Sequence, residues 1–240
     1  MKHLSFILAA SAFLFSCTTP QYTGTAVQPE EKLTGTPDPI TQSLFNDKSA
    51  TITEEHIQKI LDGSYTLPQQ LRVAIVKIDN GSSNRSYYSG YWNDEQYLKT
   101  QQAYLNIFTD KLKQSPRVTT VAIIPDLLVA KPAGFTNIRE AAVRMQADIV
   151  VVYAISADIY SKYKVFTKPA IKAFATTQLI VLDVRTGLIP FSTIVSKDQL
   201  SKKQPEELDN NEAANRIQKE AVLLTIDEIS RQLTAFLGRK

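Results

Sequence analysis

The stretch Ala147-Asp148-Ile149-Val150-Val151-Val152-Tyr153-Ala154-Ile155 decides the fold of this chain. It is the most apolar strand-like segment of the sequence and predicts a strand at residues 149–155. A second run, at residues 71–78, is apolar on both faces, as in the central strand of a sheet that is covered on both sides. The two runs therefore predict the centre of a sheet with helices packed against it.

The segments around these strands predict helices and further strands, from the spacing of their apolar residues. A short helix is predicted to end at Asp62-Gly63, and a later one, capped by Thr136 or Asn137, is predicted to run through Gln146. The apolar period predicts two longer helices, at 94–114 and 212–237. Further strands are predicted at 118–124, 159–166, 174–183 and 188–197.

This order of elements predicts a mixed sheet. The first three strands alternate with helices, which implies crossover connections and a partly parallel arrangement. The last strands follow one another without a helix between them, so they are expected to add an antiparallel meander. The predicted fold class is α/β of a mixed, α+β-like kind: a partly parallel sheet extended by an antiparallel meander, with helices packed on the sheet.

The amino-terminal segment has the pattern of an export signal. Lys2 gives a positive start, and the apolar run at residues 4–15 is too short to span a bilayer as a helix. The run ends in Leu14-Phe15-Ser16-Cys17, which contains the one cysteine of the chain. This motif resembles the lipobox of bacterial lipoproteins, although Phe15 is bulkier than the usual Ala, Ser or Thr.

The lipobox resemblance implies where the protein is held. In that family a lipid is attached to the cysteine thiol, the signal is cut before it and the new amino terminus is acylated. Cys17 is thus the predicted lipidation site, with fatty chains such as palmitate, and two or more chains anchor a protein stably. Thr18 is not the Asp that retains many lipoproteins at the inner membrane, so we expect the inner leaflet of the outer membrane, facing the periplasm. The alternative is a secreted protein with an incidental cysteine.

The domain organisation follows from this signal and from composition. Residues 1–16 are predicted to be a lipoprotein signal peptide. Residues 17–48, rich in Thr, Pro, Gln and Gly, are predicted to be the lipidated amino terminus and a flexible tether. Residues 49–240 are expected to form a single globular domain, since 43% of the chain is hydrophobic.

Composition also argues against several function classes. The net charge of +3 is close to neutral, which argues against nucleic-acid binding because that function needs a concentrated basic face. Once the signal is removed only His56 remains, which disfavours His-based catalysis and zinc sites. His56 itself is expected to be a solvated helix residue. Asp79, Asp126 and Asp148 lie at strand edges, where turns and caps also favour Asp, and do not form a convincing acid–base pair. No enzyme activity, metal or cofactor other than the covalent lipid is expected.

Three motifs carry a further resemblance. They are the strand start Arg72-Val73-Ala74-Ile75, the run Ala147-Asp148-Ile149-Val150-Val151, and a strand that ends in Asp183-Val184-Arg185-Thr186-Gly187. Together they resemble a group of envelope proteins that includes the curli secretion-channel lipoprotein, the lipoprotein activator of penicillin-binding proteins and the amino-terminal domain of TolB. The resemblance implies a protein that binds other envelope proteins or assembles into rings.

Two clusters are candidate partner-binding surfaces. The first is the aromatic loop of Tyr87, Tyr88, Tyr91 and Trp92, because aromatic side chains are enriched in interface hot spots. Alternatively, these rings cover the end of the sheet. The second cluster mixes aromatic and basic residues: Tyr160, Lys162 and Lys164.

This second cluster suits an acidic partner, lipid headgroups or weak contact with glycan, and its alternative is an ordinary solvated strand face. The leading functional hypothesis is a non-catalytic lipoprotein that acts by protein–protein contact in envelope assembly, secretion or cell-wall synthesis. The alternatives are a self-assembling ring of a secretion or export system and, third, a cell-wall hydrolase.

Overall fold

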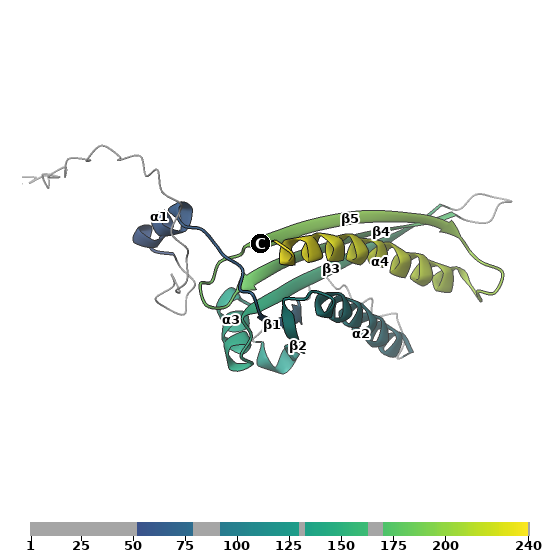
Figure 1. Ribbon diagram of the computed structural model, residues 1–240. Helices are drawn as coiled ribbons and strands as arrows, with labels where there is room; N and C mark the ends of the chain where they lie inside the picture. Colours follow the sequence, from purple (N-terminus) through teal and green to yellow (C-terminus); the bar gives the residue numbers. More distant parts are fainter. Residues whose placement is uncertain (1–51, 79–91, 130–132, 163–169, 240) are drawn as a thin grey trace, which may run out of the picture. The chain divides into compact units, whose positions relative to one another are not determined.

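The computed structural model of the chain describes residues 52–78, 92–129, 133–162 and 170–239. The lipobox residues Leu14, Phe15, Ser16 and Cys17, and the tether, lie outside the described residues. The elements in chain order are α1 (Glu54–Asp62), β1 (Leu71–Lys77), α2 (Trp92–Lys113), β2 (Val118–Ile123), the short 3-10 helix η1 (Asp126–Leu128), α3 (Phe135–Arg144), β3 (Ile149–Lys162), β4 (Ala170–Asp183), β5 (Phe191–Lys202) and α4 (Asn210–Leu237) (Figure 1).

The five strands form one mixed sheet in the order β2-β1-β3-β4-β5. Strand β1 is parallel to both β2 and β3, and the pairs β3–β4 and β4–β5 are antiparallel. The predicted fold class, a partly parallel sheet extended by an antiparallel meander, is therefore confirmed. The central strand is β3 and β1 lies beside it, and these are the two apolar runs that the sequence singles out.

The first half of β3 is buried on both faces of the sheet. Ile149, Val151 and Tyr153 belong to a core formed with α2 and α4, while Val150 and Val152 belong to a second core formed with α3. Alternate residues of a strand point to opposite faces, so a strand covered on both sides has no polar position. In Figure 1, α4 runs along the long strands, whereas α3 lies at one end of the sheet.

The lengths of the meander strands differ from the prediction. The strand expected at 149–155 and the start of the one expected at 159 form a single strand, β3, which pairs with β4 continuously from Ile149↔Asp183 to Lys162↔Ala170. The change of pattern at Ala157 reflects a loss of cover on one face rather than a break in the chain. Strand β5 begins at Phe191 instead of 188 and runs to Lys202 instead of 197, because its pairing with β4 continues to Ala170↔Lys202.

The carboxylate of Asp183 closes the turn after β4. Asp183 Oδ1 accepts hydrogen bonds from the backbone N–H and the hydroxyl of Thr186, both at 2.7 Å. Gly187 has a φ of 78°, a backbone conformation that side chains other than glycine rarely adopt. The Asp-x-x-Thr-Gly sequence is thus a structural turn that joins β4 to β5.

Two predictions about the helices are wrong. Helix α3 begins at Phe135 with Gly134 as its N-cap, so neither Thr136 nor Asn137 caps it. His56 is buried, with 9% of its surface exposed, rather than solvated. His56 and the partly buried Ile60 are four residues apart on one face of α1, while Leu61 is 73% exposed, so the buried face of this helix is offset from its apolar stripe.

Among the described helices, none has a stretch both long enough and apolar enough to pass through a membrane.

Candidate contact surface

Among the described residues, no helix or strand packs on one face of the sheet formed by the second half of β3 with β4 and β5 beside it. Helix α4 packs on the other face, where Ile171, Ala173 and Ala175 are fully buried. We call the uncovered side the open face. It consists of the alternate residues that the strand register places in neighbouring rows: Ser156, Thr176 and Ser196; Asp158, Phe174 and Asp198; Tyr160, Lys172 and Leu200; and Ile194 at one end.

Four large apolar or aromatic side chains on the open face are accessible to solvent. Tyr160 is 60% exposed, Phe174 42%, Ile194 69% and Leu200 65%. Leu200 lies six positions after Ile194 in β5, so the exposed side chains extend over roughly 20 Å along the strands. Such side chains on a regular strand face, opposite a fully buried core, are typical of a surface that contacts another molecule.

The polar side chains of the open face are bonded to one another across the strands. Lys172 Nζ lies 2.7 Å from Asp198 Oδ2, and the hydroxyls of Thr176 and Ser196 are 2.8 Å apart. The hydrogen bond and the positive charge of Lys172 lower the pKa of Asp198, which therefore stays ionised at neutral pH. Four of the polar side chains thus bond in two cross-strand pairs, and Asp158 accepts from the backbone N–H of Ile159. The aromatic and aliphatic side chains are the part of this surface that we expect to meet a partner.

Of the predicted partner-binding residues, Tyr160 is the one whose side chain the structure describes. Lys162 is the last residue of β3 and Trp92 the first of α2, and their side chains lie outside the description. Tyr87, Tyr88, Tyr91 and Lys164 also lie outside the described residues. These predictions therefore stay predictions.

The sequence analysis missed the partners of Tyr160 on the open face. Phe174, Ile194 and Leu200 come from two other strands, and the register aligns Tyr160 with Leu200 through Lys172. One signal was present: from residue 171 to 176 the chain alternates buried Ile171, Ala173 and Ala175 with polar or aromatic residues. That alternation marks a half-covered strand but does not say what lies beside it.

The carboxylates named from the sequence have structural partners or lie apart. Asp148 accepts from Arg72, which lowers its pKa, and the pair links β1 to β3. Asp126 begins η1, and Asp79 is outside the described residues. Within the described part of the chain, no three His, Cys, Asp or Glu side chains are grouped so that they could hold a metal ion.

Comparison with known proteins gives matches only among solved structures. No family model and no curated protein sequence matches the chain. The hypothetical protein CT253 from Chlamydia trachomatis is similar, with 14% identity and a TM-score of 0.40 over 70% of this chain and 98% of that chain. A minor lipoprotein from Acinetobacter baumannii has 9% identity and a TM-score of 0.34, covering 71% of this chain and 94% of its own. A PelC dodecamer from Paraburkholderia phytofirmans has 15% identity and a TM-score of 0.31, covering 67% and 89%. At these identities and TM-scores the comparison supports no statement about function.

Proposed function

We propose that this chain is a lipid-anchored lipoprotein of the bacterial envelope that acts without catalysis, by protein–protein contact through the open face. The sequence Leu14-Phe15-Ser16-Cys17 supports the anchor, with acyl chains on Cys17. Residue Thr18 supports sorting to the inner leaflet of the outer membrane, with the folded domain in the periplasm. The resemblance of three strand motifs to envelope proteins that bind other envelope proteins supports the same role.

The observation that carries the contact role is the exposed apolar set Tyr160, Phe174, Ile194 and Leu200. Complete burial of one such side chain stabilises a complex by roughly 1.5–3 kcal/mol, before the cost of association. The long β-ladder fixes the backbone that carries these side chains, so binding orders only the side chains themselves and little backbone entropy is lost. A strand surface that combines exposed apolar side chains with polar ones, and has a tyrosine at its edge, suits a protein partner in envelope assembly, secretion or wall synthesis.

A second candidate is self-assembly into a ring. In the described sheet, β2 and β5 are the edge strands, and each has one neighbouring strand. An edge strand presents backbone groups that can pair with a strand of another chain. Pairing β2 of one copy with β5 of the next is a head-to-tail contact, which closes into a ring when the rotation between copies allows it.

The mass of the native particle tests both candidates. The full chain is crosslinked in intact cells, extracted in detergent, and weighed by light scattering and mass spectrometry. We expect a complex with one other protein that is lost in Ile194→Lys and Leu200→Lys. The matched control is Leu224→Lys, because Leu224 is a 44% exposed residue of α4, outside the open face.

Each outcome of that measurement decides between the candidates. A large homo-oligomer that survives Ile194→Lys would favour the ring. A bare monomer would refute both contact proposals and leave the cell-wall hydrolase, for which Asp126→Ala should abolish wall degradation without unfolding the domain.

A further inference from the structure

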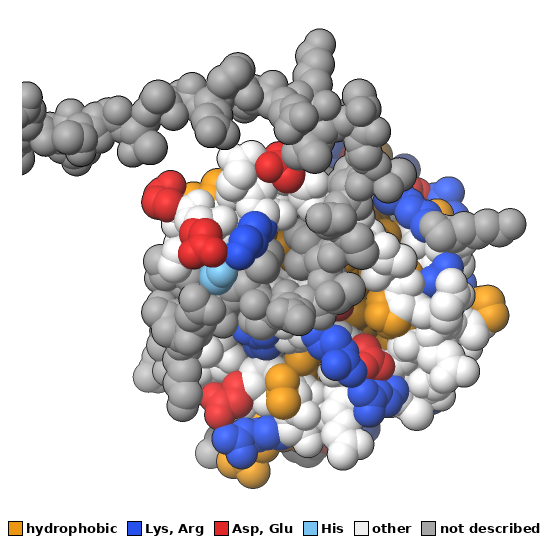
Figure 2. Space-filling view, turned by 60° about the vertical axis from the view of Figure 1, so that its left-hand side comes forward, with side chains coloured by type: hydrophobic (Ala, Val, Ile, Leu, Met, Phe, Trp, Pro, Cys, Tyr) orange, Lys and Arg blue, Asp and Glu red, His pale blue; other side chains and the backbone are white. Residues whose placement is uncertain are grey.

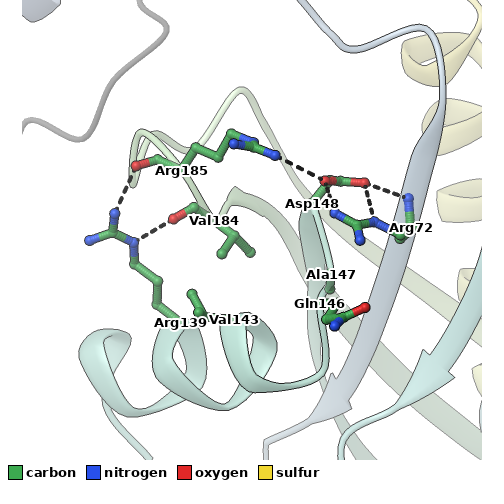
Figure 3. A pocket seen from close by; sticks show the side chains of 8 residues that line it. All are labelled: Arg72, Arg139, Val143, Gln146, Ala147, Asp148, Val184 and Arg185. Carbon is green, nitrogen blue, oxygen red and sulfur yellow. Dashed lines mark hydrogen bonds and ion pairs between the residues drawn. The ribbon is translucent and has the colours of Figure 1, made fainter.

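A depression at the opposite end of β3 from the open face has an excess of positive charge. Its volume is about 440 Å³, and its charged lining residues are Arg72, Arg139, Asp148 and Arg185 (Figure 3). These residues come from β1, α3, the start of β3 and the turn after β4. Figure 2 looks toward the end of the sheet that carries α3, where Lys and Arg side chains gather beside acidic ones.

Asp148 is the one carboxylate that lines the depression, and it already pairs with Arg72. Asp148 Oδ2 accepts from the backbone N–H and Nε of Arg72 at 2.9 and 3.0 Å, and Oδ1 accepts from Nη2 at 2.8 Å. This bidentate pair neutralises one positive charge. Nη1 of Arg72 has no acceptor among the described residues, so it remains available on the side of the depression.

Arg139 links α3 to the backbone of the turn after β4. Its Nε donates to the carbonyl oxygen of Val184 at 2.7 Å, and its Nη2 donates to that of Arg185 at 2.8 Å. Burial lowers the pKa of Arg139, and the charge of Asp183, which is not part of the lining, opposes that effect. Arg139 therefore holds the backbone of the turn in place and positions Arg185 at the rim.

The guanidinium of Arg185 makes no hydrogen bond among the described residues. Its side chain is 70% exposed, and its Nη2 lies 3.9 Å from Asp148 Oδ1, beyond hydrogen-bond distance. Figure 3 shows the guanidinium directed across the depression toward Asp148, with Val184 between it and Val143 of α3. Two guanidinium groups, those of Arg72 and Arg185, thus approach one carboxylate that Arg72 alone already satisfies, while Arg139 lines the other side of the depression. An arginine fork matches the oxygen atoms of a carboxylate or phosphate.

We propose that this depression binds a small oxyanion group, a carboxylate or a phosphate, between Arg185 and Nη1 of Arg72, over the apolar floor of Val143 and Val184. Arg185 turns from Asp148 toward the anion, while the Arg72–Asp148 pair stays intact. The carboxylate would come from the free end of a peptide, and the phosphate from a headgroup or from solution. The inference does not depend on the open face, which lies at the far end of β3.

The test is a titration of the full chain, purified in detergent, followed by NMR of the arginine Nε–H groups. The probes are inorganic phosphate and a short peptide with a free carboxyl terminus, each at constant ionic strength against chloride. We expect saturable shifts at Arg72 and Arg185 with at least one probe. Arg185→Gln should weaken that binding about tenfold or more. Arg231→Gln is the matched control, since it removes a 69% exposed arginine of α4 and should leave the affinity unchanged.

The two probes distinguish the sources of the oxyanion. Saturation by phosphate alone assigns a phosphate ligand, and saturation by the peptide alone assigns a peptide carboxylate. Shifts that chloride reproduces, that do not saturate, or that persist unchanged in Arg185→Gln would overturn the proposal. Because Arg185 is exposed and makes no hydrogen bond through its side chain among the described residues, its replacement should leave the fold intact.

Discussion

The turn carboxylate Asp183 should be worth several kcal/mol to the stability of the domain. It is 4% exposed and accepts three hydrogen bonds: two from Thr186 at 2.7 Å and one from the hydroxyl of Tyr65 at 3.0 Å. Burial, together with the charge of Asp183, raises the pKa of Tyr65, so this hydroxyl stays protonated and keeps donating at neutral pH. The carboxylate thus ties the segment before β1 to the turn between β4 and β5.

Two replacements of Asp183 separate its charge from its shape. A hydrogen bond to a charged group contributes about 1.5–3 kcal/mol, but bonds that share one acceptor group are not additive. Asp183→Ala removes all three acceptor contacts and leaves a buried N–H of Thr186 unpaired, so we expect a loss of about 3–5 kcal/mol. Asp183→Asn keeps an oxygen for Thr186 and loses the acceptor for Tyr65, so we expect a loss of about 1–2 kcal/mol.

Urea unfolding of the full chain in detergent, followed by circular dichroism, measures both losses. The control is Asp209→Ala, because Asp209 is an exposed N-cap whose Oδ1 accepts from the backbone of Asn211 and Glu212 at 2.8 Å. Loss of such a cap costs about 1 kcal/mol. A cost for Asp183→Ala no greater than that of Asp209→Ala, or equal costs for the Asn and Ala variants, would refute this reasoning.

Three further perturbations test other parts of the molecule. Arg72 lowers the pKa of Asp148, so the pair stabilises the fold fully above the pKa of the unfolded carboxyl and loses this effect as the pH falls through the lower, folded pKa. The difference in stability between wild type and Asp148→Asn should therefore shrink as the pH falls below about 4, and a difference constant with pH contradicts this. Phe108 is fully buried with its ring 4.7 Å from that of Tyr153, so Phe108→Ala should cost about 3–5 kcal/mol in urea unfolding, and a cost under about 1 kcal/mol would mean that this core is not packed as described. Cys17→Ser should remove the acyl mass and move the protein from the membrane fraction to the periplasmic extract, whereas unchanged fractionation would disprove the anchor.

The strand register explains why the sequence predicted the sheet better than its open face. Tyr160 could be named from its own segment, which mixes aromatic and basic residues. Its aliphatic neighbour Leu200 lies 40 residues later in the chain and falls beyond the end of the strand predicted at 188–197. Pairing with β4 extends β5 through that stretch and brings Leu200 level with Tyr160.

The same limit applies to the arginine-lined depression. Asp148 was noticed at a strand edge and Arg72 and Arg185 within family-like motifs, but nothing local connects them. Arg72 and Asp148 are 76 residues apart and meet because β1 and β3 are parallel neighbours. For His56 the helix was predicted from the sequence, but the face of that helix that is buried depends on tertiary packing.

The sequence by itself predicted the helices, most of the strands and, from their order, a mixed sheet. Helices and strands can be predicted in this way because the apolar period and turn residues such as Gly187 act over a few neighbouring residues. Only the tertiary structure decided which half of β3 loses its cover, because α3 is shorter than the strand against which it packs. The open face and the charged depression both follow from that packing, since each is built from residues that only long-range strand pairing brings together.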